Sequence, residues 1–194
     1  MYFLPGMKLG SDFKTGRNWS LTSWLRYGIP DLGAFTMSWE PNGENSQRLM
    51  IRQRGQPYWT TGDLNNDSAF EFMNVKNQGS IYQYHGFYPG DSYGDQPYRL
   101  LTDQGQAQGD NGLIWSPLYC YGYDSGNGCV AGSNSPSCRS KDDKIALFDG
   151  YFALGMAEDS YDDNSSVSFS DCMVRCWNNC TCLAYNTHDN RTGL

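Results

Sequence analysis

The sequence is poor in charged residues, above all in basic ones, and it has no long apolar run. Charged side chains make up 18% of its 194 residues, with 14 Lys and Arg against 21 Asp and Glu. Nucleic-acid binding needs clustered basic side chains, so the net charge of -7 argues against a nucleic-acid partner. No stretch approaches the roughly 18 consecutive apolar residues of a membrane-spanning helix. The 15% aromatic content excludes a disordered chain, and the length suits one domain or two small ones.

The signatures of common catalytic sites are also missing. The chain has no P-loop, no glycine-rich kinase loop and no H-R-D motif, and residues 148–150 read F-D-G rather than D-F-G. A G-x-S-x-G pattern surrounds Ser92, but Pro89 precedes it, and the only histidines are His85 and His188. A nucleophile elbow needs a strand before the serine and a helix after it, so this pattern indicates a turn-rich loop. We expect no catalytic residue, no bound metal and no cofactor.

Cysteine is absent from the first 119 residues, and all seven cysteines lie at or after Cys120. The N-terminal part must therefore fold without disulfides, whereas the remainder is short and polar enough to depend on them. Seven cysteines cannot all pair within one chain, so a monomer must keep at least one free thiol. The candidates for disulfide bonding are Cys120, Cys129, Cys138, Cys172, Cys176, Cys180 and Cys182.

The cysteine-rich tail and five Asn-x-Ser/Thr acceptor patterns are typical of an extracellular protein. The glycosylation candidates are Asn18, Asn66, Asn164, Asn179 and Asn190. The first residues, MYFLPGMKLG, have no basic segment followed by an apolar run, because Pro5 and Gly6 interrupt the few apolar side chains. The sequence therefore suggests a piece of a longer secreted or membrane-anchored protein.

The N-terminal part has the pattern of an antiparallel β structure. Short β-prone runs recur every 10–15 residues with Gly, Pro, Asn and Asp between them, and no helical period appears. We place turns around Pro30-Asp31 and at residues 41–43. The expected strands are residues 19–24, 33–40, 48–52, 58–61, 70–75, 80–87, 98–102 and 112–115.

The C-terminal part contains the one clear helix signal. Ser168 or Ser170 can cap a helix, and Asp171 favours its positive end. Cys172 and Cys176 are four residues apart and would share one face of that helix. We also expect short strands at residues 144–148, 151–154 and 179–185, the last leaving the helix. A Cys120–Cys129 bridge would close the polar loop between these residues and contribute about 2–3 kcal/mol.

Three further patterns allow a functional and a structural interpretation. The C-x3-C-x3-C-x-C cluster at 172–182 could bind zinc, but it lacks the paired C-x2-C of zinc ribbons, so a disulfide framework is favoured. The acidic run 158–164 could attract Ca²⁺, but it lacks the glycine and glutamate of an EF-hand loop, which favours a solvated loop. His85 lies among Tyr82, Tyr84, Phe87 and Tyr88, where sheet packing is favoured over a carbohydrate-stacking surface.

Several segments, in this order, resemble the extracellular region of plant S-domain receptor kinases, also called G-type lectin S-receptor-like serine/threonine kinases. In the first half they are 4–10 (LPGMKLG), 14–16 (KTG), 21–24 (LTSW), 30–35 (PDLGAF) and 58–62 (YWTTG). The last of these is similar to the family's W-x-S-G-x-W segment without its second Trp. The tail, from Asp171-Cys172 to Ala184-Tyr185, resembles the helix and strand of a PAN/apple domain.

The resemblance implies a mostly β (α+β) fold. An antiparallel S-locus glycoprotein-type β domain would be followed by a partial PAN/apple module with one helix on a small sheet. On this basis residues 1–10 end a bulb-type lectin domain and 11–119 form the S-locus glycoprotein-type domain. Residues 120–138 are a reduced EGF-like cysteine segment, and 139–194 a truncated PAN/apple domain. In the family a transmembrane helix and a cytoplasmic kinase follow, and neither is expected in this chain.

The function implied is a non-catalytic extracellular recognition region in cell-surface signalling, such as self or pollen recognition or defence. Its partners would be a peptide or protein ligand and another receptor ectodomain. The family's mannose-binding pattern Q-x-D-x-N-x-V-x-Y is absent, so carbohydrate binding is not expected. A soluble secreted S-locus-like glycoprotein is the alternative. A second alternative is a chain that shares the name serine/threonine receptor kinase with its family although it lacks the kinase domain.

The resemblance also implies a set of cysteine pairings. It favours Cys176–Cys182 and Cys120–Cys129 as structural bridges and leaves open whether Cys138 pairs with Cys180. Cys172 would be left unpaired, because the downstream cysteine that family members use does not occur in this sequence.

Overall fold

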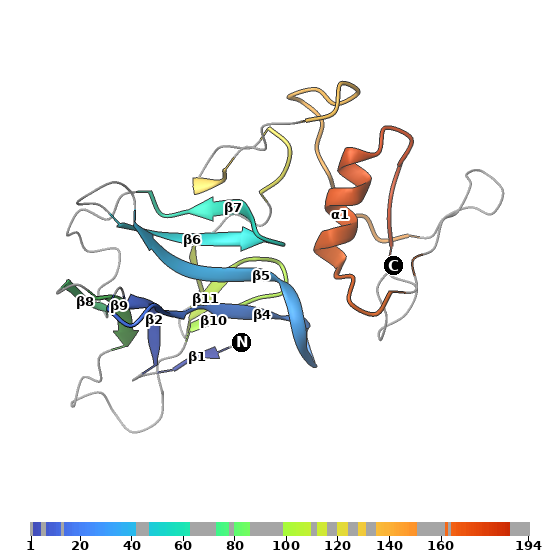
Figure 1. Ribbon diagram of the computed structural model, residues 1–194. Helices are drawn as coiled ribbons and strands as arrows, with labels where there is room; N and C mark the ends of the chain where they lie inside the picture. Colours follow the sequence, from blue (N-terminus) through green and yellow to red (C-terminus); the bar gives the residue numbers. More distant parts are fainter. Residues whose placement is uncertain are drawn as a thin grey trace.

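The computed structural model describes residues 2–4, 7–12, 14–41, 47–62, 73–77, 80–85, 99–109, 112–115, 120–123, 128–130, 135–150, 162 and 164–186. Within these residues the chain forms twelve strands and one helix, which lies beside the strands rather than among them (Figure 1). The strands are β1 (Tyr2–Phe3), β2 (Lys8–Asp12), β3 (Arg17–Trp19), β4 (Leu21–Arg26), β5 (Ile29–Pro41), β6 (Gln47–Gln53), β7 (Gln56–Thr60), β8 (Met73–Asn77), β9 (Ser80–His85), β10 (Arg99–Leu101), β11 (Ala107–Gly109) and β12 (Gly112–Trp115). The helix is α1 (Phe169–Asn178).

The described strands form three four-stranded antiparallel sheets. Their strand orders are β1-β10-β11-β12, β3-β2-β9-β8 and β4-β5-β6-β7. The third sheet is a meander of consecutive hairpins, and β4 alternates buried and half-exposed residues along its length. This period of two is the expected pattern of a strand with one buried face. The predicted mostly antiparallel fold is therefore confirmed.

A single apolar core lies where the three sheets meet. β10 packs against β4 and β5, and β2 packs against β5. Phe35 and Leu49 of the third sheet and Leu101 of the first are completely buried, and Leu9 of the second joins them. Gly105 is required beside this core, because its φ is +79° and an added Cβ would lie 2.6 Å from the Phe35 ring.

Sequence patterns located most of these strands but misplaced one turn. The turn expected at Pro30-Asp31 lies instead at Tyr27-Gly28, where Gly28 has a φ of +80°. β5 starts at Ile29, so both expected turn residues belong to a strand. Proline is tolerated near the first residue of a strand, which explains why it does not interrupt β5. The pattern also missed β1, β2, β11 and all of β3 except Trp19. The expected turn at 41–43 lies mostly outside the described residues.

A disulfide fastens the loop after the sheets onto the edge strand β7. Cys120 is bonded to Cys129, and both residues are buried. The Cys120 N–H donates to the hydroxyl of Tyr58 at 2.9 Å, and the Val130 N–H donates to the Tyr58 carbonyl at 2.9 Å. One residue of β7, Tyr58, therefore anchors both ends of the disulfide loop.

The helix begins where the sequence predicts. Ser168 is the N-cap, and its side chain and that of Asp171 form a reciprocal capping box. The buried face of the helix carries Cys172, Met173 and Trp177, at the spacing of one helical stripe. The chain leaves the helix at Asn179, whose N–H bonds to the Arg175 and Cys176 carbonyls.

Arg139 holds the C-terminal end of this helix. Its guanidinium donates to the carbonyls of Trp177 and Cys176 at 3.0 Å each and to that of Asn179 at 3.1 Å. It also lies 5.4 Å from the centre of the Trp177 ring. The last carbonyls of a helix have no partner within the helix and carry the negative end of its dipole. The Arg139 cation therefore supplies hydrogen-bond donors to these carbonyls and also interacts favourably with the helix dipole.

Two of the strands expected in the C-terminal part are absent. Residues 144–148 form no strand, and Leu147 and Phe148 are 84% and 86% exposed. Residues 179–185 form a turn and an irregular segment. A strand needs a neighbour for its backbone hydrogen bonds, and neither segment has one among the described residues. The described residues between 120 and 186 therefore form no small sheet under the helix, while the strand expected at 151–154 lies outside the described residues.

Six of the seven cysteines form three disulfides, and Cys172 is buried and takes part in none of them. The bonds Cys120–Cys129 and Cys176–Cys182 are the two expected pairs, and the third bond joins Cys138 to Cys180, a pairing that the sequence left open. Oxidised cysteines cannot ligate a metal, so the zinc interpretation of the 172–182 cluster is wrong. None of the described helices is long and apolar enough to cross a membrane.

The burial of Cys172 leads to a test of the disulfide framework. Because its side chain is 1% exposed, iodoacetamide should label no thiol in the native monomer and one thiol after denaturation without reductant. Intact-mass measurement counts the labels, and Cys172→Ala should remove the single label. A denatured monomer with three or more labels would show that one of the three bonds does not form.

The contacts of Arg139 lead to a second test. Arg139→Met keeps most of the side chain but removes the hydrogen bonds to the helix carbonyls, and it should lower the free energy of unfolding by about 2–3 kcal/mol. Urea unfolding at fixed pH measures the change. Lys141→Met, which removes an exposed cation two residues away, is the matched control and should stay within about 0.5 kcal/mol. Equal losses in both variants would contradict the capping role.

Candidate functional site

Most of the motifs that the sequence singled out do not converge on a site. Ser92 and His188 lie outside the described residues, as do all of the acidic run 158–164 except Asp162 and Asn164. His85 ends β9 opposite Met73, and the backbone alone is described there. No group of three His, Cys, Asp or Glu side chains that could hold a metal ion occurs in the part of the chain that the structure describes.

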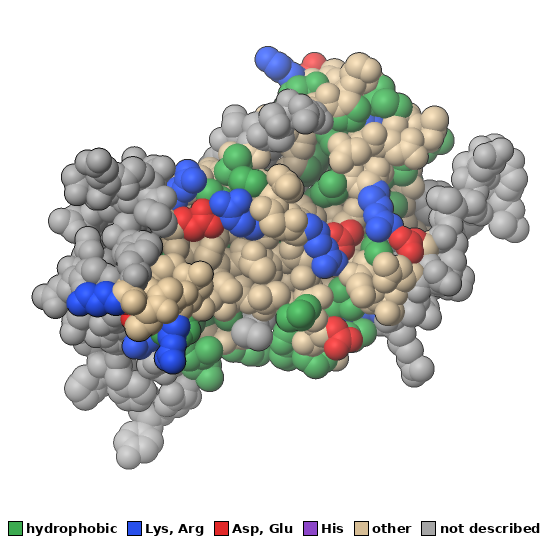
Figure 2. All heavy atoms as spheres, viewed as in Figure 1, with side chains coloured by type: hydrophobic (Ala, Val, Ile, Leu, Met, Phe, Trp, Pro, Cys, Tyr) green, Lys and Arg blue, Asp and Glu red, His purple; other side chains and the backbone are tan. Residues whose placement is uncertain are grey.

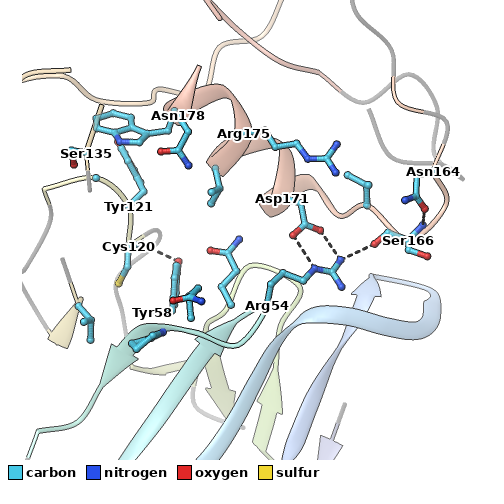
Figure 3. Close-up of a pocket in the computed structure, with 18 residues that line it drawn as sticks. Arg54, Tyr58, Cys120, Tyr121, Ser135, Asn164, Ser166, Asp171, Arg175 and Asn178 are labelled. Carbon is cyan, nitrogen blue, oxygen red and sulfur yellow. Dashed lines mark hydrogen bonds and ion pairs between the residues drawn. The ribbon is translucent and has the colours of Figure 1, made fainter. Parts of the chain in front are cut away.

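A cavity of about 970 Å³ lies between the β6–β7 hairpin and helix α1 (Figure 3). Its walls come from three separate parts of the chain. The hairpin contributes residues 53–58, the disulfide loop contributes Cys120 to Gly122, and the helix contributes Asp171 to Asn178 on one face. We call this cavity the interdomain cleft. Ligand sites commonly occur between two packed units, which makes the interdomain cleft the candidate functional site.

One end of the interdomain cleft is closed by an ion pair between Arg54 and Asp171 (Figure 3). The Arg54 Nε and Nη2 atoms donate to the two Asp171 carboxylate oxygens at 3.0 and 2.7 Å, a bidentate geometry. Nη2 also donates to the Ser166 carbonyl at 2.7 Å. Gln53 adds a hydrogen bond to the Ser170 carbonyl at 3.1 Å. The tip of the hairpin is thereby attached to the first turn of the helix.

The hairpin turn itself is shaped for this contact. Arg54 and Gly55 form a two-residue turn between β6 and β7, with φ values of +48° and +83°. Positive φ at both positions is typical of a type I′ turn, which Gly accepts readily and Arg does not. Arg54 is the only described non-glycine residue with a positive φ. Its unfavourable backbone is offset by the charged hydrogen bonds that its side chain makes.

Asp171 serves the capping box and the ion pair at once. Its Oδ2 atom accepts from the Ser168 N–H and hydroxyl at 2.8 Å each, in addition to Arg54. Burial disfavours the charged carboxylate, but the hydrogen bonds from Arg54 and Ser168 outweigh burial and hold the pKa of Asp171 below its usual range. The carboxylate therefore stays charged at neutral pH and can support both contacts.

The deeper wall of the interdomain cleft is aromatic and closely packed. Tyr121 and Trp177 meet edge to face with ring centres 5.0 Å apart. An added Cβ at Gly122 would lie 2.3 Å from the Trp177 ring, so only glycine fits against the indole. The Trp177 Nε1 atom is buried and has no hydrogen-bond acceptor among the described residues. Such an unsatisfied donor costs about 1–3 kcal/mol.

Charges around the interdomain cleft are paired. Arg175 on the helix forms an ion pair with Asp162, as Arg54 does with Asp171, and Arg52 pairs with Glu40 at 2.8 Å on the neighbouring sheet face. Figure 2 shows basic and acidic side chains side by side across this face of the molecule, with no large area of one sign. The surface beside the interdomain cleft is therefore close to electrically neutral.

Three of the five glycosylation candidates are described, and all three are exposed. Asn18 lies in β3, whereas Asn164 precedes helix α1 and Asn179 follows it. The Asn179 Oδ1 atom accepts from the Thr181 N–H and hydroxyl at 3.1 and 2.9 Å, so the acceptor triplet is locally ordered. Asn66 and Asn190 lie outside the described residues.

Sequence reasoning missed the residues that build the interdomain cleft. Arg54, Tyr58 and Arg139 carry no motif, because each acts through a partner more than 30 residues away. One usable signal existed for Arg54. The Arg-Gly pair separates two expected strands, and a two-residue turn presents its first side chain at the tip of a hairpin.

The lowered pKa of Asp171 makes the hairpin–helix contact acid-sensitive. The unfolded chain takes up the proton first as pH falls, so the stabilisation present above about pH 3.9 is lost as pH drops through the folded-state pKa. Asp171→Asn should therefore lower the free energy of unfolding by about 2 kcal/mol at pH 7 and by clearly less at the lowest pH. Urea unfolding across this range tests it, with exposed Asp142→Asn as control. A pH-independent difference would contradict the role of the Asp171 charge.

Comparison with known proteins assigns the two parts of the chain. Residues 138–194 match the model of the PAN-like domain. Two similar curated proteins are G-type lectin S-receptor-like serine/threonine-protein kinases of Arabidopsis thaliana. CES101 is 29% identical over 237 aligned residues, covering 98% of this chain and 28% of the relative. The protein At1g67520 is 29% identical over 200 residues, covering 98% of this chain and 24% of the relative.

The matches cover nearly all of this chain but only a minor part of each relative. The chain spans about a quarter of the length of the curated relatives it matches, and the PAN-like domain is a non-catalytic module. A third Arabidopsis thaliana relative, SD1-1, is 25% identical and covers 98% of this chain and 30% of its own length. The homologues of this chain are thus G-type lectin S-receptor-like kinases, matched over 98% of its length, and its C-terminal part is a PAN-like domain.

Proposed function

We propose that this chain is a non-catalytic recognition region on the extracellular side of an S-domain receptor-like kinase. It binds a peptide or protein ligand and takes part in the association of receptor ectodomains. The observation that carries the proposal is the match to three receptor kinases over 98% of the chain, which includes the PAN-like domain. The disulfide framework supports it, because stable disulfides belong to oxidising compartments.

The proposal includes a domain division and a set of modifications. Residues 1–10 belong to a bulb-type lectin domain, 11–119 form the S-locus glycoprotein-type domain, 120–138 a reduced EGF-like segment and 139–194 a PAN/apple domain. The three disulfides between residues 120 and 182 stabilise the C-terminal part, whose described residues form no sheet of their own. Exposed sites at Asn18, Asn164 and Asn179 carry N-linked glycans. Glycans on either side of helix α1 would shield its ends from other proteins.

The geometry also favours recognition over catalysis. The titratable groups that line the interdomain cleft are engaged in ion pairs or helix capping, and Asp171 is held in its charged form. A general acid or base works best with a pKa near the operating pH, and the Asp171 pKa is shifted away from that range. The interdomain cleft is therefore suited to holding a ligand rather than to transforming one.

The experiment that tests the proposal uses the secreted, oxidised chain immobilised on a sensor surface. Extracellular fluid from the source tissue is separated by size, and each fraction is passed over the surface in increasing amounts. We expect saturable retention from at least one fraction, and we expect protease treatment of that fraction to abolish it. The reduced and alkylated chain is the control and should retain nothing, because its C-terminal part depends on disulfides.

Two results would contradict the proposal. One is the absence of saturable retention from every fraction. The other is retention that survives protease treatment but is lost after glycosidase treatment, which would make the chain a carbohydrate-binding module instead.

A further inference from the structure

We infer that the interdomain cleft is the binding site for a neutral, extended peptide segment. The inference rests on the proposed function and deepens it, because it names the place and the chemistry of ligand recognition. The volume of about 970 Å³ is at the upper end of the range for small-molecule sites, about 300–1,000 Å³, and accommodates several amino-acid residues.

The paired charges argue for a neutral ligand. Arg54 is held by both oxygens of Asp171, and Arg175 is held by Asp162. An acidic or phosphorylated ligand would have to displace a carboxylate from one of these guanidinium groups. A basic ligand would have to take Asp171 from Arg54 and from the helix N-cap. Either exchange replaces one ion pair by another and yields little net affinity.

The aromatic side chains argue against a carbohydrate. Sugars bind by stacking on an open ring face, and two of the three aromatic rings in the lining are almost fully buried, with Tyr58 at 4% and Trp177 at 6% exposure. The Tyr58 ring packs edge to face on Phe35 with centres 4.9 Å apart. The Trp177 ring is engaged by Tyr121 and by the Arg139 guanidinium. The third ring, the half-buried Tyr121, packs on Trp177 and is held by hydrogen bonds between its hydroxyl and the Ile145 backbone.

The remaining lining matches a peptide. Gln56 and Asn178 are exposed on opposite walls, and each carboxamide offers a donor and an acceptor in the arrangement of a peptide group. Pro57, Val130 and Val174 supply apolar surface for side chains between these polar ends. An extended neutral segment satisfies both features together.

The test follows the indole N–H signals of the intact, oxidised chain by NMR after ¹⁵N labelling of its 6 tryptophans. Three pools of capped random hexapeptides, one neutral, one acidic and one basic, are titrated to millimolar concentration, and cellohexaose is titrated as the carbohydrate probe. We expect the neutral pool to shift the Trp177 signal, because the indole lines the interdomain cleft and a bound segment changes its environment. We expect the other three probes to leave it in place.

Variants locate the site. Val174→Trp fills the interdomain cleft and should weaken binding of the neutral pool about tenfold or more. Leu183→Trp adds the same ring at a position that is 87% exposed and away from the cavity lining, and it should bind normally. Gln56→Ala, an exposed position that carries little risk to folding, should weaken binding about fivefold through loss of its hydrogen bonds. Unchanged urea midpoints establish that each variant is folded.

Each outcome decides the inference. A shift of Trp177 by the neutral pool that is lost in Val174→Trp or Gln56→Ala but kept in Leu183→Trp supports it. A preference for the acidic pool, the basic pool or cellohexaose, or no response to any probe, overturns it. If Val174→Trp and Gln56→Ala still retain the proteinaceous fraction from the extracellular fluid, the proposed function stands and the ligand binds elsewhere. If the unmodified chain retains no fraction, the proposed function itself fails.

Discussion

The arrangement of this protein depends on one contact, the ion pair between Arg54 at the tip of the β6–β7 hairpin and Asp171 in the first turn of helix α1. The sheets have an apolar core of their own, but the helix and the irregular segments around it bury few large side chains. Their position relative to the sheets is set by Arg54, by Gln53 on the Ser170 carbonyl, and by the Cys120–Cys129 loop on Tyr58. A bidentate arginine–carboxylate pair fixes orientation as well as distance, which a hydrophobic contact alone does not.

The same aspartate caps the helix, so folding of the helix and its attachment to the sheet are coupled. Ser168 and Arg54 hydrogen-bond to one carboxylate, and at the other end of the helix Arg139 bonds to the last carbonyls. An isolated helix of this length is only marginally stable in water, because the free-energy cost of nucleating the helix exceeds the stabilisation from its few backbone hydrogen bonds. Both ends of α1 are therefore stabilised from outside the helix, by side chains more than 30 residues away in sequence. This coupling keeps the walls of the interdomain cleft in place before a ligand arrives, which reduces the entropy cost of binding.

Local patterns in the sequence predicted most of what is local in the structure. The alternation in β4, the strand at 112–115 and the N-cap at Ser168 follow from side-chain period and capping chemistry alone. The prediction of a turn at Pro30 was wrong because proline also fits the start of a strand. The prediction of a strand at 144–148 was wrong because an apolar run in the sequence does not show whether a neighbouring strand is present to pair with it. The interdomain cleft could not be predicted, since Arg54, Tyr58 and Trp177 become neighbours only through the tertiary fold.

The neutrality of the interdomain cleft has a consequence for selectivity. The chain as a whole carries a net charge of -7, so long-range electrostatics would draw basic partners toward it. Asp171 is the one carboxylate among the described lining residues, and Arg54 already holds it, so the lining offers such partners no unpaired carboxylate. Encounter and recognition would thus be governed by different parts of the molecule. The overall charge sets how often partners approach, while the paired charges and the carboxamides of the lining decide which segment stays bound.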